Sequence, residues 1–246
     1  MKLARYKTSN PYSYAFGATL TFELLNTHPE LIQRVFLRPD IKHGEDLEQI
    51  IQKLQQRHIE IIESTKAFNI QGAKDSCLMM AEFKKPSQKL DDEQPHVVLV
   101  NPSDSGNLGT IMRTAAAFGY QNLAVILPAV DTYNPKTIRA SMGAVFHLNI
   151  QIFNDMQEYI NQFGANRRQL FAFMLDKNAT SLENVSAPTH NYSLVFGNEA
   201  SGLPKDFATW TGATPIFIPQ SSQVDSLNLS VAASIAIYHF ANKTTL

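Results

Sequence analysis

Near its carboxyl end the chain reads Ile218-Pro219-Gln220-Ser221-Ser222-Gln223-Val224-Asp225-Ser226-Leu227-Asn228-Leu229-Ser230-Val231-Ala232-Ala233-Ser234-Ile235. An apolar strand meets a proline, and a polar turn then opens a helix that we predict over residues 226–240. Hydrogen-bonding side chains occupy the start of this helix, whereas its remainder is small and apolar. A polar first turn of a helix that faces an open loop is suited to binding a ligand. The alternative is a core helix capped by Ser226 or Asp225.

A second stretch of this kind lies at residues 101–115, Asn-Pro-Ser-Asp-Ser-Gly-Asn-Leu-Gly-Thr-Ile-Met-Arg-Thr-Ala. It follows an apolar strand predicted over 96–100 and opens a helix predicted over 108–118. Its glycine spacing fits neither the dinucleotide fingerprint nor the P-loop. We expect Asn107 to act as the helix N-cap or to face a ligand. Arg113 stands among apolar residues, and its alternative role is a surface ion pair.

The third stretch, residues 194–204, reads Leu-Val-Phe-Gly-Asn-Glu-Ala-Ser-Gly-Leu-Pro. A buried strand ends here in a glycine-bounded turn that carries the carboxylate of Glu199. The glycines indicate a backbone that bends around a ligand, although an ordinary polar turn is the alternative.

All three loops follow strands of one predicted sheet. Its strands, at 96–100, 123–127, 170–174, 194–196 and 215–218, are apolar throughout, which is typical of a parallel sheet covered on both faces. Ligands bind beyond the carboxyl ends of such strands. The three loops together therefore predict one ligand site at this edge.

A charged, proline-bounded stretch at residues 86–95 divides the chain. Before it, residues 1–85 predict a small α/β domain, with a helix over 13–26 and strands near 35–37, 59–62 and 77–83. Residues 1–94 carry 13 basic and 13 acidic side chains, and residues 95–246 carry 8 and 9. With a net charge of −1, any nucleic-acid site must be a local patch.

The composition is that of an ordinary globular protein of 246 residues. No apolar run approaches the roughly 20 residues that span a bilayer, and the first residues lack an apolar signal core. The lone Cys77 forms no internal disulfide and suits a reducing compartment. We therefore predict a cytoplasmic protein without a membrane partner.

The motif order N-x-G-x-I-x-R-T-A, F-G-N-E-x-x-G-L and I-P…S-L-N-x-S-x-A resembles that of the SPOUT superfamily, and within it the TrmH/SpoU group of RNA ribose 2′-O-methyltransferases. The resemblance covers about residues 96–242, within a methyltransferase domain that we predict over residues 96–246, and residues 136–144 are also similar to the family. It implies a parallel sheet tied into a trefoil knot, S-adenosylmethionine as the cofactor, and a homodimer. Residues 1–85 resemble the RNA-binding domain that precedes many such enzymes.

By this resemblance the catalytic residues are Arg113, Asn107, Glu199, Ser226 and Asn228. Arg113 would orient the ribose and stabilise the developing oxyanion, and Glu199 would help to hold Arg113 or its loop. The cofactor would bind at a set that mixes glycines, apolar residues and one amide: Phe196, Gly197, Asn198, Gly202, Ile218, Pro219 and Leu227. No metal cluster is visible in the sequence, and methyl transfer from a sulfonium needs none.

The substrate implied is RNA, with ribosomal RNA favoured over transfer RNA because short family members acting on transfer RNA commonly lack a front domain. The candidates for phosphate contacts and base stacking are Lys2, Arg5, Tyr6, Lys7, Tyr12 and Tyr14. The alternative is that the tyrosines pack in a small core and the lysines lie in water. Two alternatives remain: the same reaction on transfer RNA, and an RNA-binding module that keeps the fold without the chemistry. A small-molecule enzyme would require an acid–base pair that the sequence does not offer.

Overall fold

The computed structural model describes residues 3–42, 44–164, 167–176, 178–186, 188 and 191–243. The chain divides into two compact units. The first contains the residues up to Pro86 together with Asp131–His147, and the second contains Ser87–Val130 and the residues from Leu148 onward. The first unit therefore takes up a segment that lies, in the sequence, within the stretch predicted as the methyltransferase domain.

The first unit is built on a four-stranded sheet in the order β1-β4-β2-β3. β4 pairs antiparallel with both β1 and β2, and β3 pairs parallel with β2. The strands are β1 (Tyr12–Phe16), β2 (Ile32–Leu37), β3 (Glu60–Glu63) and β4 (Met79–Lys84). The helical elements are α1 (Ala18–Thr27), η1 (Pro29–Leu31), α2 (Glu45–Gln56), α3 (Thr65–Gln71), α5 (Pro135–Ala140) and η2 (Ala144–His147).

The helix predicted over residues 13–26 was wrong in its first turn. Tyr12–Phe16 pairs with β4 as strand β1, and the helix begins only after Gly17. Gly17 has a φ of 100°, a backbone conformation that side chains disfavour, and it ends the strand before the helix starts. Pairing with a distant strand therefore overrides the helical pattern of this stretch.

One buried polar row crosses the first sheet from β1 to β2. Tyr14 donates to the carboxylate of Glu82 at 2.9 Å, and Arg34 reaches the same carboxylate at 3.2 Å. Burial and the Glu82 charge raise the pKa of Tyr14 above its usual value. Because Tyr14 is 4% exposed, it belongs to the core, so of its two predicted roles the structure has core packing and not base stacking. Lys2, proposed alongside it, lies outside the described residues.

The second unit contains a seven-stranded sheet in the order β7-β6-β5-β10-β8-β11-β9, and every pairing in it is parallel. This confirms the predicted α/β class with a parallel carboxyl-terminal sheet. Its strands are β5 (His96–Val100), β6 (Asn122–Ile126), β7 (Asn149–Phe153), β8 (Gln169–Phe173), β9 (Thr180–Ser181), β10 (Tyr192–Phe196) and β11 (Thr214–Phe217).

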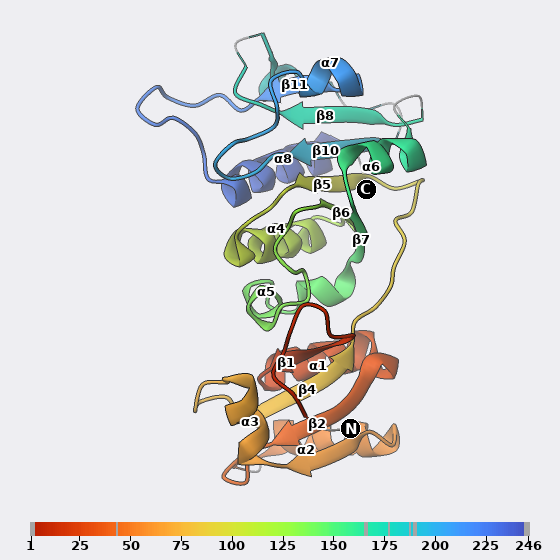
Figure 1. The fold of residues 1–246 in the computed structure, drawn as a ribbon, viewed down its shortest axis with the longest axis vertical. Helices are drawn as coiled ribbons and strands as arrows, with labels where there is room; N and C mark the ends of the chain where they lie inside the picture. Colours follow the sequence, from red (N-terminus) through yellow and green to blue (C-terminus); the bar gives the residue numbers. More distant parts are fainter. Residues whose placement is uncertain are drawn as a thin grey trace. The chain divides into compact units, whose positions relative to one another are not determined.

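Helices cover this sheet, and α4 packs directly against α8 (Figure 1). The helical elements are α4 (Ser105–Ala117), α6 (Met156–Phe163), η3 (Leu182–Asn184), α7 (Phe207–Thr211) and α8 (Leu229–Lys243). In the described part of the chain, no helix is both long and apolar enough to cross a membrane.

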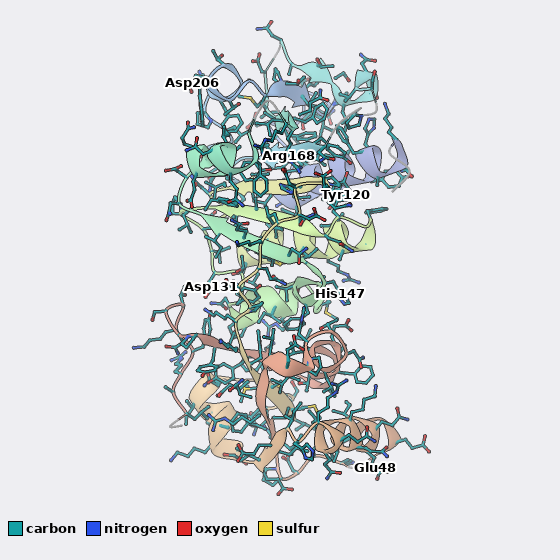
Figure 2. All side chains as sticks on the ribbon, turned by 90° about the vertical axis from the view of Figure 1, so that its right-hand side faces the viewer. Glu48, Tyr120, Asp131, His147, Arg168 and Asp206 are labelled. Carbon is teal, nitrogen blue, oxygen red and sulfur yellow. The ribbon has the colours of Figure 1, made fainter. Side chains whose placement is uncertain are left out.

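Residues 87–95 pack onto the second unit through a buried arginine (Figure 2). Arg168 is 2% exposed and donates to the carbonyl oxygens of Asp92, Gln94 and Tyr192 at 2.6, 3.0 and 2.7 Å. Buried guanidinium donors require such partners, so this arginine fixes the connecting segment to the amino ends of β8 and β10. The segment thus brings its three acidic residues, Asp91–Glu93, to the second unit.

Candidate functional site

The first loop of the predicted site ends at the start of α4, three residues earlier than expected. Asp104 is the N-cap, and its carboxylate accepts from the backbone amide of Asn107 at 2.8 Å. The prediction that Asn107 caps this helix was therefore wrong. Because Asp104 satisfies the helix start, the side chain of Asn107 is available for other contacts.

Glu199 joins the second loop to the first. Its carboxylate accepts from the backbone amide of Ser103 at 3.0 Å, from the Ser103 hydroxyl at 2.7 Å and from the backbone amide of Asp104 at 3.1 Å. The side-chain amides of Asn107 and Asn198 donate to it at 3.2 and 3.3 Å. A carboxylate that accepts several donors holds its surroundings in one geometry.

These contacts also set the charge of Glu199. Burial by itself raises the pKa of a carboxyl group, but the hydrogen bonds from Ser103 and Asn107 outweigh burial here. The pKa of Glu199 is consequently lowered, so the side chain is a carboxylate at neutral pH. Glu199 is therefore a fixed negative charge between the first two loops.

Asn228 joins the third loop to the first. Its side-chain amide donates to the side-chain oxygen of Asn107 at 3.0 Å, and its own oxygen accepts from the Ser230 and Val231 backbone amides at 2.9 and 3.4 Å. Asn228 thus caps α8, which begins at Leu229 rather than at residue 226. The predicted caps, Ser226 and Asp225, were wrong because both precede the helix.

Gly197 allows the second loop to close on itself. A Cβ atom at this position would lie 2.2 Å from the carbonyl carbon of Gly202 and 2.3 Å from the nitrogen of Leu203. No side chain fits there, and Asn198 forms a bridge with Gly202 across the turn. Asn198 also donates to the carbonyl of Asn101 at 2.8 Å, which fastens the turn to the end of β5.

A cavity of about 650 Å³ opens beside the second and third loops, within the volume range of small-molecule and cofactor sites. Nearly all of the predicted cofactor residues line it, namely Phe196, Gly197, Asn198, Gly202, Ile218 and Leu227. Glu199 and Ser226, predicted as catalytic, line it as well, whereas Pro219, Asn107 and Asn228 do not. Phe173 and Phe196 stack at a centroid distance of 4.5 Å and form part of its apolar wall.

Arg113 lies on the exposed side of α4 and outside the wall of this cavity. Among the described residues it forms no hydrogen bond or ion pair. Two alternatives were predicted for Glu199, holding Arg113 or holding the loop. The structure has the second, because Glu199 bonds to Asn107 and to the loop before α4. Asn107 and Arg113 are six residues apart on this helix, which is about 9 Å along its axis.

Sequence reasoning missed several residues of the site. Ser103 and Asp104 hold Glu199, and the segment after β8 contributes Met174, Leu175, Asp176 and Asn178 to the cavity. The spacing of Asp104 and Asn107 is a capping signal that pointed to the true helix start. No local signal marks Asp176, because only the strand order brings it to the site.

The fold and the site together define an α/β enzyme with a cofactor-sized cavity at the carboxyl edge of a parallel sheet. The model of the SpoU rRNA Methylase family matches residues 94–238, more than half of the chain. The protein therefore belongs to the SpoU rRNA methylase family and is an RNA methyltransferase, which confirms the predicted resemblance.

Named relatives agree with this assignment. The chain is 26% identical to the 23S rRNA (guanosine(2553)-2′-O)-methyltransferase RlmP of Bacillus subtilis, covering 91% of this chain and 86% of that protein. It is 32% identical to a putative tRNA (cytidine(34)-2′-O)-methyltransferase of Bacillus subtilis, covering 58% of this chain and 89% of that protein. An AdoMet-bound rRNA methyltransferase from Sinorhizobium meliloti superposes with a TM-score of 0.80 at 26% identity, covering 94% and 87% of the two chains.

Proposed function

We propose that this protein transfers a methyl group from S-adenosylmethionine to a ribose 2′-hydroxyl of ribosomal RNA. The observation that carries the proposal is the bonded set Glu199–Asn107–Asn228, which joins all three motif loops and in which Glu199 lines the cavity. Methyl transfer requires the acceptor oxygen to lie in line with the donor methyl group. The hydrogen-bonded side chains of Glu199, Asn107 and Asn228 are rigid enough to provide such positioning.

The cavity fits the cofactor in size and in chemistry. Its walls combine apolar side chains with the close backbone turn at Gly197, where main-chain groups are free to recognise a ligand. The negative charge of Glu199 at the same edge favours a ligand that carries a sulfonium cation. S-adenosylmethionine supplies the activated methyl group when it is bound here.

The predicted catalytic side chains have different roles in the reaction. Asn107 and Asn228 position the ribose hydroxyl, and Ser226 shapes the side of the cavity that faces the RNA. Arg113 orients the target phosphate and stabilises the negative charge that develops on the oxygen, because guanidinium groups bind oxyanions and are too basic to serve readily as general bases. Glu199 acts through Asn107 rather than through Arg113.

The first unit supplies the electrostatic attraction for RNA. It carries 14 lysines and arginines against 11 aspartates and glutamates, a net charge of +3, whereas the second unit carries 7 against 11, a net charge of −4. RNA phosphates are attracted by positive charge, so the catalytic unit gains from a basic partner unit. Exposed Lys136 and Arg139, which fold with the first unit, contribute to this charge.

A homodimer fits the apolar surface of α8. Val231, Ile235 and Tyr238 recur at helical spacing and are 46%, 38% and 56% exposed. Tyr238 also contacts the ring of the exposed Phe118, the residue that caps the carboxyl end of α4, at a centroid distance of 5.5 Å. An exposed apolar stripe of this kind is suited to pairing with the same stripe of a second copy. We further propose that the segment leading into α8 threads the trefoil knot of the family.

Ribosomal RNA is favoured over transfer RNA by the length of the match. The named ribosomal enzyme aligns over 91% of this chain, whereas the transfer RNA enzyme aligns over 58%. The proposed substrate therefore uses both units of the protein. A cytoplasmic location, predicted from the lone Cys77, is part of the same proposal.

The deciding experiment maps ribose methylation on total RNA from cells that lack the protein, with wild-type or Arg113→Ala protein restored. We expect one ribosomal nucleotide to lose its 2′-O-methyl group and to regain it only with the wild type. A methyl group lost from a transfer RNA would overturn the ribosomal assignment. An unchanged methylation map would contradict the proposed activity.

A further inference from the structure

The strand order fixes which loop faces which part of a ligand in the cavity. Along the sheet, β5, β10, β8 and β11 are consecutive neighbours, spaced by about 4.8 Å. Their carboxyl ends lead to Asn107, Glu199, Asp176 and Ile218 in the same order. A ligand that lies along this edge therefore meets the four loops one after another.

In S-adenosylmethionine the sulfonium with its methyl group is joined to the ribose, and the ribose to the adenine. Only one orientation along the sheet edge would place the methyl group next to the catalytic residues. The methyl group would have to lie toward Glu199, the cavity residue that holds Asn107 in the helix after β5. The adenine would then reach the apolar Ile218 and Leu227 beyond β11. The ribose, which connects the sulfonium to the adenine, would lie between these ends and face the loop after β8.

Asp176, in this loop, lines the cavity and brings a carboxylate to it. It is partly buried, and one of its carboxylate oxygens accepts from the backbone amide of Asn178 at 2.9 Å. Among the described residues, its second oxygen accepts no hydrogen bond. The other carboxylate in the cavity wall, Glu199, already accepts five donors from the protein.

We propose that Asp176 recognises the cofactor by accepting hydrogen bonds from its ribose hydroxyls. A carboxylate at the carboxyl edge of a parallel sheet serves this purpose in dinucleotide-binding folds, since it accepts from vicinal hydroxyls without competing donors. This inference rests on the proposed cofactor and adds a specificity-determining residue to it.

Calorimetry with two small ligands tests the contact without a methylation assay. 5′-Methylthioadenosine has the ribose hydroxyls but lacks the amino acid and the sulfonium charge, and its 2′-deoxy analogue lacks one hydroxyl. We expect Asp176→Asn to weaken both S-adenosylmethionine and 5′-methylthioadenosine at least tenfold. The wild type should prefer the hydroxylated ligand over the deoxy ligand, and Asp176→Asn should lose this preference.

A matched control is Asp206→Asn, an exposed aspartate before α7 that lies outside the cavity wall (Figure 2). It should bind every ligand as the wild type does. If Asp176→Asn keeps the preference for the hydroxylated ligand, the inference is wrong. Weakening of S-adenosylmethionine alone would place Asp176 against the amino acid part and overturn the ribose assignment. A wild type that binds none of these ligands would instead refute the proposed function.

Discussion

The side-chain amide of Asn228 donates to the side-chain oxygen of Asn107 at 3.0 Å, across 121 positions of the sequence. Each partner has a second task, because Asn228 caps α8 and Asn107 donates to Glu199. The starts of two helices and the loop after β10 are thus held by one chain of amides ending at a carboxylate. Substitutions among these hydrogen-bonded residues separate their contribution to stability from their contribution to catalysis.

Asn228→Asp keeps an oxygen for the α8 cap but removes the amide donor that reaches Asn107. We expect its free energy of unfolding to stay within about 0.5 kcal/mol of the wild type while methylation falls at least tenfold. Asn228→Ala should also lose about 1 kcal/mol of stability, because the cap is gone. Urea unfolding and a single-turnover methylation assay distinguish the two. Full activity in Asn228→Asp would show that the Asn107 contact has no catalytic value.

Glu199→Gln replaces a carboxylate that accepts five hydrogen bonds by an amide that can accept fewer. We expect the variant to be about 1–3 kcal/mol less stable at pH 7. The pKa of Glu199 is lowered in the folded protein, so its contribution to stability is present above the unfolded pKa and disappears as pH falls through the folded pKa. Urea unfolding of both proteins should therefore converge in acid. Glu183→Gln, on an exposed turn, is the matched control and should behave as the wild type at every pH.

The buried His96 gives a second dependence of stability on pH, and it too makes the protein less stable as the pH falls. It is fully buried and bonded to the Tyr159 hydroxyl and the Asp91 carbonyl, both at 2.8 Å. Burial, with a contribution from the Arg168 charge, lowers the pKa of His96 from 6.5 to about 3. Between these values the unfolded chain binds the extra proton, so this residue costs about 1.4 kcal/mol of stability for each pH unit below 6.5.

The corresponding measurement compares urea unfolding at pH 7 and pH 5 for the wild type and His96→Gln. The variant should lose less stability than the wild type on acidification, by about 2 kcal/mol. An equal loss in both proteins would mean that His96 is not responsible for acid sensitivity.

Ile235→Glu should convert the proposed dimer into monomers. Ile235 lies in the exposed apolar stripe of α8, and a charge buried in a dimer interface without a partner costs several kcal/mol. Sedimentation over a range of concentrations gives the oligomeric state. Ile152→Glu, at an exposed position of edge strand β7, is the control and should stay dimeric. A wild type that sediments as a monomer would refute the proposed dimer.

Lys136→Gln combined with Arg139→Gln should weaken RNA binding and reduce its dependence on salt. Both cations are exposed and belong to the basic first unit. Each lost phosphate contact lowers the slope of log affinity against log salt by about 0.7–0.9. Filter binding at several salt concentrations measures this slope, and exposed Lys89→Gln in the acidic second unit is the control. Equal slopes in all three proteins would argue against phosphate contacts at α5.

The motifs could be predicted from the sequence because their signals are local. Apolar runs such as residues 96–100 predict buried parallel strands, and Gly197 marks a turn where no Cβ atom fits. The loops at the carboxyl ends of those strands had to share one edge, since all strands of a parallel sheet point the same way. The fold class and the family followed from these local features alone.

Only the tertiary structure decided which polar group contacts which. Asp104 rather than Asn107 caps α4, and Glu199 bonds to Asn107 rather than to Arg113. The cap is local, because Asp104 and Asn107 are three residues apart. The Glu199 contact joins groups 92 residues apart, and spacing along the chain carries no information about it. Residues 131–147 join the first unit for the same reason. Because this segment carries Lys136, Arg139 and Asp131, grouping it with the first unit widens the charge contrast between the units to +3 against −4.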